Sequence, residues 1–302
     1  MSSTGMLIVI DGLDGSGKNT QAEMLYNFFK ENITDKVIKI SFPDYDYHTG
    51  KVVREMLTGK FNIGVNEWPF DKSIKKSLFY SFDRMVAMYR KLPEYDNKTI
   101  AELYYKEGYV IICDRYTTSN FIHMGVNIRR FDLPSFISQL EGLEYSTMGI
   151  IRPDIVIALT LNPETSMKLI DKRGNEKDDH ENLNHLKKAY NTMNHILKYI
   201  KTDWYNIDCN DEENDFIKDK DVIQREIRRI IQSYTNDKIN KLITYDSESA
   251  WYRVYKSFEK IKNNEKQNVK SMNKCPQCNH ELNELITIDG YYCRNCDNVW
   301  IL

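Results

Sequence analysis

Met6-Leu-Ile-Val-Ile-Asp-Gly-Leu-Asp-Gly-Ser-Gly-Lys18 joins a short apolar run to a glycine-rich loop that ends in lysine. The apolar run has the composition of a buried strand, and residues at helical spacing follow the loop. The loop itself has the GxxxxGK spacing at which backbone N–H groups and a helix N-terminus surround phosphate oxygens. The stretch therefore predicts an ATP site in which Lys18 reaches the β- and γ-phosphates. Its residues are Gly12, Asp14, Gly15, Ser16, Gly17, Lys18, Asn19 and Thr20.

Four more short apolar segments follow along the chain, at Lys36–Ser41, Tyr109–Cys113, Asp154–Thr160 and Trp204–Asp208. They are apolar without strict alternation, which indicates strands that are covered on both faces. Longer stretches with helical spacing separate them, and this alternation is typical of a parallel sheet. We predict an α/β domain over residues 1–233, with a five-stranded parallel sheet flanked by helices.

The composition argues against some classes of protein. The 302 residues include 42 Lys or Arg and 44 Asp or Glu, so the formal charge of −2 does not suit a protein that coats nucleic acid or an anionic membrane. No apolar run approaches the roughly 18 residues of a membrane span. The N-terminus lacks the basic segment of a signal peptide. We expect a cytoplasmic protein without membrane contact and without disulfide bonds.

Two residues are candidates for binding a magnesium ion beside the nucleotide. Asn19 stands where this type of loop normally carries the hydroxyl that binds Mg²⁺, and its amide oxygen is a weaker ligand. Asp114 follows the apolar segment Tyr109–Cys113, and a carboxylate at that end of a strand lies beside the phosphate loop in an open parallel sheet. We expect Mg²⁺ as a cofactor, with Asp114 and Asn19 as candidate ligands.

Four further motifs carry a family resemblance. They are Asp114-Arg115-Tyr116 with Ser119-Asn120, Phe42-Pro43, Tyr80-Ser-Phe-Asp-Arg84 and Gly50-Lys-Val-Val-Arg54. In this order and spacing they resemble the DRY…SN, FP, (F/Y)xxDR and GxxxR elements of the thymidylate (dTMP) kinases, over roughly residues 1–230. The resemblance implies a P-loop nucleoside monophosphate kinase fold, the phosphorylation of dTMP to dTDP by ATP, and a homodimer.

The acceptor site follows partly from chemistry and partly from the resemblance. Arginines form bidentate contacts with phosphate oxygens, which suits Arg54 and Arg115. The resemblance implies that Tyr80 stacks on thymine, that Arg84 bonds its O4 atom, and that Asn120 meets the N3 edge. It also places Asp14 near the acceptor 3′-hydroxyl and the metal, which makes Asp14 a third candidate ligand of Mg²⁺. The expected dTMP-binding set is Asp14, Phe42, Arg54, Tyr80, Arg84, Arg115, Ser119, Asn120 and His123.

Some of these residues have structural alternatives. Tyr80 has Leu78, Phe79 and Phe82 as neighbours and could belong to the core, and Arg84 could pair with a surface carboxylate. His123 stands where many family members have a tyrosine that is thought to exclude ribose, so the discrimination against ribose stays open.

A lid over ATP is expected at 172–177. The resemblance divides the family by whether the basic residue lies in the phosphate loop or in the lid, and Gly15 in the loop points to the second kind. Arg173, with Lys177 as a second candidate, would neutralise the transferred charge. The alternative is a solvated helix end. The expected catalytic residues are Asp14, Lys18, Asp114, Arg115 and Arg173.

The C-terminus carries two CxxC pairs separated by 14 residues, formed by Cys275, Cys278, Cys293 and Cys296. This spacing predicts a zinc ribbon over 273–302, with a short hairpin between the pairs and Zn²⁺ bound by four thiolates. Redox-active dithiols are the alternative. The ribbon could contact nucleic acid or protein, or add stability.

Residues 234–272 precede the ribbon and are expected to form a basic helical linker. From 253 to 274 there are seven basic side chains and two acidic ones. A solvated helix and a stripe that faces nucleic acid are both open.

Two other functions remain as alternatives to a dTMP kinase. The acceptor could be dUMP or a modified pyrimidine monophosphate. The chain could also be a catalytically weak scaffold that carries a binding ribbon.

Overall fold

The computed structural model describes residues 5–63, 67–173, 182–199, 203–214, 216–241 and 249–270, together with three strands between 283 and 301. Its centre is a five-stranded parallel sheet in the order β2-β5-β1-β6-β7. The strands are β1 (Met6–Gly12), β2 (Val37–Ser41), β5 (Val110–Asp114), β6 (Ile155–Thr160) and β7 (Trp204–Asp208). Each corresponds to one of the five predicted segments, so the predicted α/β architecture is confirmed.

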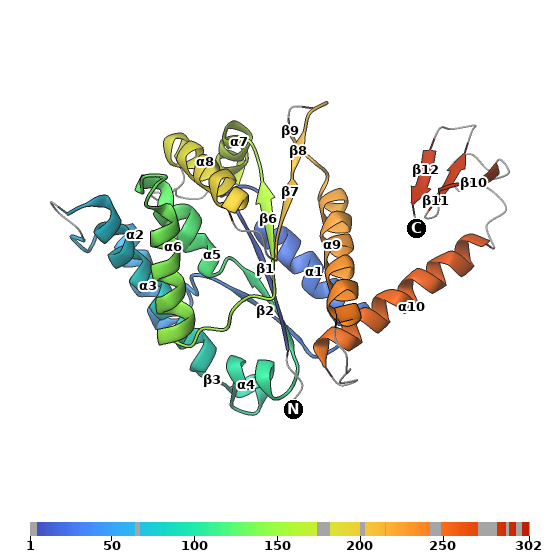
Figure 1. The fold of residues 1–302 in the computed structure, drawn as a ribbon, viewed down its shortest axis with the longest axis horizontal. Coiled ribbons are helices and arrows are strands. Elements are labelled where there is room, and N and C mark those ends of the chain that lie inside the picture. Colours follow the sequence, from blue (N-terminus) through green and yellow to red (C-terminus); the bar gives the residue numbers. More distant parts are fainter. Residues whose placement is uncertain are drawn as a thin grey trace.

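Helices cover both faces of this sheet (Figure 1). The helices are α1 (Lys18–Asn32), α2 (His48–Leu57), α3 (Pro69–Tyr89), α4 (Ile100–Tyr105), α5 (Thr117–Ser119), α6 (Leu133–Glu141), α7 (Pro163–Arg173), α8 (Leu183–Tyr199), α9 (Lys220–Lys241) and α10 (Ala250–Lys270). Two π-helical segments, η2 (Asn120–Met124) and η4 (Gly142–Thr147), and two 3₁₀ turns, η1 (Pro93–Tyr95) and η3 (Gly125–Asn127), connect them. Two small hairpins pair β3 (Lys91–Leu92) with β4 (Lys98–Thr99) and β8 (Asn210–Asp211) with β9 (Phe216–Ile217).

The central strand β1 shows why the sheet is covered on both sides. Its side chains alternate, so that Met6, Ile8 and Ile10 pack into a core with α1 and α9, while Leu7 and Val9 pack into a core with α3 and α4. All five of these side chains are fully buried. A strand with two buried faces needs apolar residues at every position, which explains the unbroken apolar run in the sequence.

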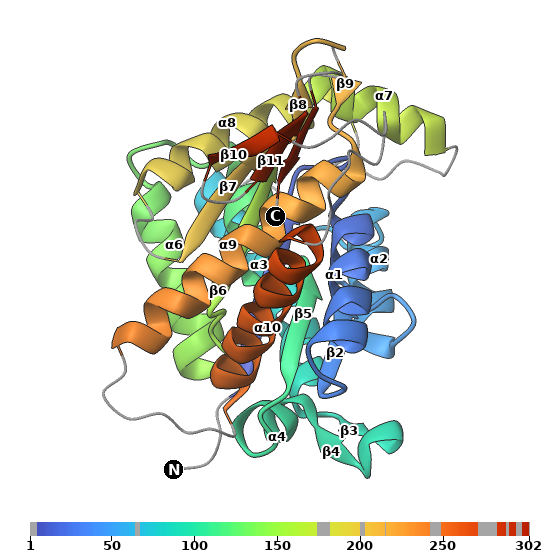
Figure 2. The same ribbon diagram turned by 90° about the vertical axis from the view of Figure 1, so that its right-hand side faces the viewer.

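The C-terminal part of the domain differs from the prediction. Helix α9 runs across the predicted boundary at residue 233, and α10 packs against it and against α1 (Figure 2). Val254 and Phe258 of α10 are buried, and the Phe258 ring lies 5.9 Å from that of Phe28. The interpretation of 234–272 as a linker is therefore wrong for the first half of α10, because its apolar face belongs to the main core.

A small three-stranded antiparallel sheet follows α10, in the order β10-β11-β12. Its strands are β10 (Asn283–Thr287), β11 (Gly290–Cys293) and β12 (Asn298–Ile301). The β10–β11 hairpin follows the first CxxC pair and ends at Cys293, the first cysteine of the second pair. Cys275, Cys278 and Cys296 lie outside the described residues, and only the backbone of Cys293 is described, so the zinc site stays a prediction.

None of the helices in the described ranges combines the length and the apolar character needed to cross a membrane.

Candidate active site

The loop between β1 and α1 is shaped for phosphate. Gly15 and Gly17 have φ angles of 81° and 85°, in the left-handed region that favours glycine. A side chain at Gly15 would meet the carbonyl oxygen of Ser166 at 2.7 Å, so the loop also packs closely on α7. Lys18 is buried, and its Nζ donates to the Leu13 carbonyl oxygen at 2.6 Å. The Lys18 side chain thus lies across the phosphate loop, where it could reach a bound phosphate.

Two residues that line the cleft at this loop have a buried polar atom with no hydrogen-bond partner within the described part of the chain. The two atoms are the Ser16 hydroxyl oxygen and Oδ1 of Asp114. Burial raises the pKa of the Asp114 carboxyl, while the nearby Lys18 ammonium opposes this shift. Buried polar atoms are rarely left unpaired, so both point to a polar ligand in the cleft. An oxygen of this kind beside a phosphate loop suits Mg²⁺.

The other two candidate magnesium ligands are placed differently. Asn19 is exposed, lines the same cleft, and its Oδ1 lies 3.5 Å from Nζ of Lys39. Asp14 forms an ion pair with Arg115, and its Oδ1 lies 3.6 Å from Nζ of Lys18. The structure therefore brings Asp14, Asn19 and Asp114 to one cleft, but Asp14 is already paired with cations.

The cleft at the phosphate loop has a second wall that sequence reasoning missed. Residues 217–220 and Ile223, from β9 and the start of α9, line it together with residues 14–21. Lys218 on this wall donates to the Asp208 carbonyl oxygen at 2.6 Å. These residues lie about 200 positions from the loop in the chain, so no local motif could associate them with it.

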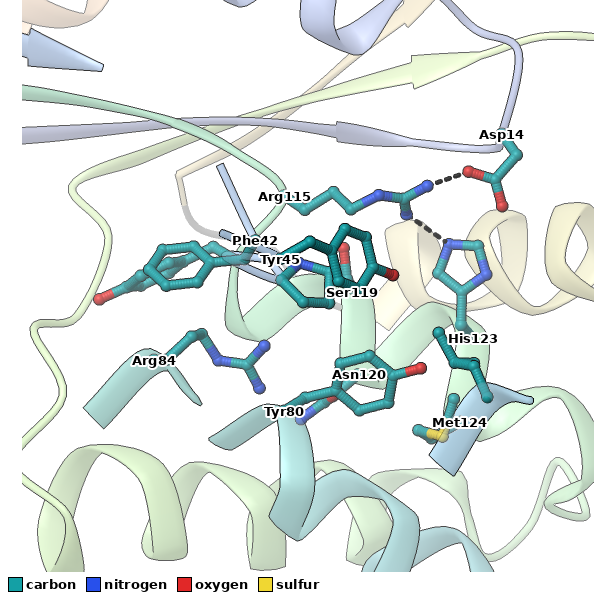
Figure 3. A pocket seen from close by; sticks show the side chains of 13 residues that line it. Asp14, Phe42, Tyr45, Tyr80, Arg84, Arg115, Ser119, Asn120, His123 and Met124 are labelled. Atoms are coloured by element: carbon teal, nitrogen blue, oxygen red, sulfur yellow. Dashed lines mark hydrogen bonds and ion pairs between the residues drawn. The ribbon is translucent and has the colours of Figure 1, made fainter. Parts of the chain in front are cut away.

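A second cavity adjoins the loop (Figure 3). Its lining contains eight of the nine expected acceptor residues, namely Asp14, Phe42, Tyr80, Arg84, Arg115, Ser119, Asn120 and His123. It also contains Pro43, Tyr45, Leu57, Tyr116 and Met124. Arg54 is the exception, since it is exposed and its guanidinium lies 4.6 Å from the centre of the Tyr45 ring. Arg54 thus lies one side chain away from the cavity.

Tyr80 and Arg84 lie one turn apart on α3. Tyr80 is half-buried, lines the cavity and also packs against the core near α6 and α8. Its side chain thus belongs partly to the core, and its stacking on the base stays a prediction. Arg84 is 1% exposed and pairs with Glu144 at 2.7 Å. The carboxylate that pairs with Arg84 is therefore buried rather than on the surface. Glu144 was missed, because a single glutamate carries no sequence signal.

Asp11 is the other residue that sequence reasoning missed. It is fully buried near the end of β1, and Ser119 Oγ lies 2.9 Å from both of its carboxylate oxygens. Thr118 Oγ1 donates to the same carboxylate. Asp11 thereby ties α5 to the strand that carries the phosphate loop. An acidic residue at the end of an apolar strand, as at Asp114, is the signal that could have identified it.

Arg115 connects the two cavities. Its φ of 62° lies in the left-handed region, which non-glycine residues rarely adopt and which recurs at functional sites. Its Nη1 lies 3.2 Å from His123 Nε2, and His123 Nδ1 lies 3.4 Å from His185 Nε2. Because a guanidinium only donates, His123 Nε2 accepts, and its proton lies on Nδ1, toward His185.

The expected lid lies largely outside the described residues. Helix α7 ends at Arg173, of which only the backbone is described, and Lys177 is not described.

Comparisons with known proteins show the family to which the chain belongs. The family model described as "Thymidylate kinase" matches residues 10–220. The chain belongs to the thymidylate kinase family. It is 29% identical over 198 residues to the thymidylate kinase of Caldicellulosiruptor saccharolyticus, which covers 65% of this chain and 85% of that one. It is 31% identical over 168 residues to the probable thymidylate kinase of Thermococcus onnurineus, which covers 56% of this chain and 72% of that one.

Solved structures of the family share the fold. The thymidylate kinase of Candida albicans matches with a TM-score of 0.56 and 21% identity, over 82% of this chain and 98% of that one. The enzyme of Ehrlichia chaffeensis matches with a TM-score of 0.50 and 21% identity, over 76% of this chain and 100% of that one. The matched family region ends at residue 220, before α10 and the C-terminal strands.

Proposed function

We infer that this chain transfers the γ-phosphoryl group of ATP to dTMP, which yields ADP and dTDP. One observation carries the inference. A phosphate-binding cleft and a pocket lined by aromatic and amide side chains meet at the same two residues, Asp14 and Arg115, which line both. Phosphoryl transfer requires a donor and an acceptor phosphate in line, and two adjoining cavities with a shared cationic group supply that arrangement.

The chain's own residues provide positioning and charge. Lys18 would exchange its contact with the Leu13 carbonyl for phosphate oxygens of ATP, while Arg115 would hold the acceptor phosphate. Tyr80 offers its ring to the base, and the Arg84 and Asn120 side chains offer polar atoms to the base edge. Arg173 and Lys177 remain our candidates for neutralising the transferred charge.

Asp114, with Asn19 and Asp14 directly or through water, would hold the magnesium ion of the nucleotide. The unpaired Oδ1 of Asp114 supports this assignment. When bound, Mg²⁺ neutralises charge on the donor phosphates.

The test is a turnover assay with ATP and a panel of monophosphates. We expect kcat/KM for dTMP to exceed that for dGMP by at least about a hundredfold, because a pocket that hydrogen-bonds one base leaves its polar groups unpaired with another. Comparable values for dTMP and dGMP would contradict the proposal. The value for dUMP decides how far the pocket uses the 5-methyl group.

We propose a second feature, a structural Zn²⁺ held by Cys275, Cys278, Cys293 and Cys296. The antiparallel hairpin β10–β11 between the two pairs supports it, since a ribbon of this size lacks a sufficient core and draws its folding energy from metal. Metal analysis of protein purified without chelator should find one zinc per chain, lost on deletion of 272–302. A zinc-free full-length protein would refute the assignment.

We also propose a cytoplasmic homodimer. Helix α3 exposes Leu78, Phe82 and Tyr89, which lie at helical spacing along one side and form a face for a second copy. Light scattering of the Phe82→Asp variant should report the mass of a monomer, where the unaltered chain gives that of a dimer.

A further inference from the structure

A buried carboxylate lies behind the two residues that would meet the base edge. Glu144, on η4, is 1% exposed. Its Oε1 accepts from Arg84 Nη2 at 2.7 Å, and its Oε2 accepts from Arg84 Nε at 3.2 Å. The same Oε1 accepts from Asn120 Nδ2 at 2.7 Å. One side chain, from a segment between α6 and β6, therefore holds both residues.

The contact with Arg84 fixes the plane of its guanidinium group. Two parallel hydrogen bonds between a guanidinium and a carboxylate define the orientation of the guanidinium as well as its position. They use Nε and one N–H of Nη2, which leaves Nη1 to donate elsewhere. Arg84 lines the acceptor cavity, and Figure 3 shows its guanidinium directed toward the space beside Tyr80 and Asn120.

The contact with Asn120 determines which end of its side-chain amide faces the cavity. An asparagine amide can present either its oxygen or its nitrogen to a ligand. Nδ2 of Asn120 faces Glu144 Oε1 and lies 3.4 Å from two further oxygens, on Ser77 and Ser81. A carboxylate accepts only, so the nitrogen must face Glu144. The amide oxygen is then the atom that Asn120 offers to a base in the cavity.

This pair of groups matches one kind of pyrimidine. A donor from Arg84 beside an acceptor from Asn120 complements the O4 acceptor and N3–H donor of thymine or uracil. Cytosine carries the opposite pattern, with an amino donor at C4 and an acceptor at N3. With Glu144 in place, cytosine would put a donor against a donor and an acceptor against an acceptor.

Stability alone does not explain such a carboxylate. A buried ion pair gains little over apolar residues of the same volume, because desolvation of the two charges offsets their attraction. We propose that Glu144 is a positioning residue that makes the pocket select a 4-keto pyrimidine over a 4-amino pyrimidine. The inference rests on the proposed function, since it assigns the base selectivity of that same acceptor site.

The test compares Glu144→Gln with Glu141→Gln. Both substitutions remove one carboxylate charge, but Glu141 is on the surface and pairs with the exposed Arg152 at 2.9 Å. Each variant is assayed with ATP and with dTMP, dUMP or dCMP as acceptor, and the KM for ATP is measured alongside.

Both oxygens of Glu144 accept from Arg84, so a glutamine at 144 loses one bond to Arg84 whichever way its amide is turned. When its nitrogen takes the place of Oε1, it also turns the Asn120 amide over. We expect KM for dTMP to rise at least about tenfold, and the ratio of kcat/KM between dTMP and dCMP to fall at least about tenfold. KM for ATP should stay within about twofold, and Glu141→Gln should match the unaltered chain in every respect. A merely structural role would lower kcat or the amount of folded enzyme without changing the ratio, and that result would overturn the inference.

A second variant covers a failure of Glu144→Gln to fold. Glu144→Asp keeps the charge and should retain the preference for dTMP over dCMP, with a raised KM for dTMP. If neither variant shows a cooperative unfolding transition, Glu144 serves the fold and the positioning role is wrong. The proposed function fails separately, if the unaltered chain does not phosphorylate dTMP.

Discussion

Arg115 and Asp14 form an ion pair at the point where the two cavities of the molecule meet. Asp14 belongs to the phosphate loop after β1, and Arg115 follows the neighbouring strand β5. Both line the nucleotide cleft and the acceptor pocket. Because the carboxyl ends of parallel strands meet at one edge of the sheet, residues about 100 positions apart in the chain share one site.

This pair predicts a large effect of removing the arginine. Arg115→Ala should lower kcat/KM for dTMP on the order of a hundredfold, because the acceptor phosphate loses its cation. Arg115→Lys should restore part of the loss, since lysine keeps the charge but not the bidentate geometry. Steady-state kinetics with dTMP check this, and Arg129→Ala, at an exposed arginine paired with Asp132, is the control. A change of less than about threefold in Arg115→Ala would speak against the assignment.

The exposed position of Asn19 predicts a small effect. Asn19→Ala should cost less than about tenfold in kcat/KM, or roughly 1.4 kcal/mol, because Mg²⁺ needs only one or two carboxylates besides phosphates and water. Lys18→Ala and Asp114→Ala should each cost on the order of a hundredfold or more. A magnesium titration of the rate for each variant separates the cases. If high Mg²⁺ rescues an inactive Asn19→Ala enzyme, the amide is a true ligand.

The packing of α10 predicts that its first half is needed for stability. Phe258→Ala should lower the free energy of unfolding by about 3 kcal/mol, the usual cost of removing a buried phenylalanine. Lys260→Ala, at an exposed site on the same helix, should change it by less than about 0.5 kcal/mol. Urea denaturation of the three proteins measures both values. A stable Phe258→Ala variant would mean that α10 is dispensable.

Deletion of residues 272–302 should leave kinase activity largely intact, because every candidate catalytic residue lies before residue 180. Deletion of 249–302 should instead destabilise the domain, since it removes Val254 and Phe258 from the core. Kinase activity and unfolding curves are measured for both truncations. They show whether the ribbon is needed for catalysis or has a role outside it. An inactive but folded shorter truncation would establish the second.

Asp154 predicts a dependence of stability on pH. It accepts from the backbone N–H of Leu7 at 2.7 Å and from the Tyr104 hydroxyl at 2.9 Å, and burial raises the pKa of its carboxyl to about 6. A raised pKa means that the folded state binds this proton more tightly than the unfolded state. The stabilisation is therefore complete below about pH 4 and is lost as the pH rises through about 6.

The variant Asp154→Asn isolates this contribution, because it keeps an acceptor oxygen but cannot titrate. Between pH 4 and 7, the free energy of unfolding of the unaltered chain should fall relative to that of the variant, by up to about 3 kcal/mol. Denaturation series at several pH values give the difference. Parallel curves would show that the carboxyl titrates normally.

The sequence predicted the sheet well because both of its faces are buried. Trp204–Asp208 matches its strand at both ends. Asp114, Lys18 and Gly15 could be located at the phosphate-loop cleft because the signal for each lies in its neighbours in the chain, and their roles stay predictions. Glu144 and Lys218 could not be predicted in this way, since each meets its partners only after distant segments fold together. Asp11 differs from them, because its place at the end of an apolar strand was a signal that the interpretation did not use. Helix α10 was interpreted as part of a linker because its few apolar residues lie among many lysines. The high positive charge was taken as a sign of a solvated helix.

Because α10 packs against the core of the main domain, its end at residue 270 is a suitable place to replace the C-terminal segment with another domain. The helix packs on Phe28 and Phe29, about 15 Å along α1 from Lys18 at the phosphate loop. Helix α10 packs with α1 and α9 on one face of the sheet, whereas α3, which carries Tyr80 and Arg84 of the acceptor pocket, packs on the other face. A different domain fused after this helix, such as a fluorescent reporter or an affinity tag, would therefore be joined to the enzyme on the sheet face opposite α3 and its acceptor residues.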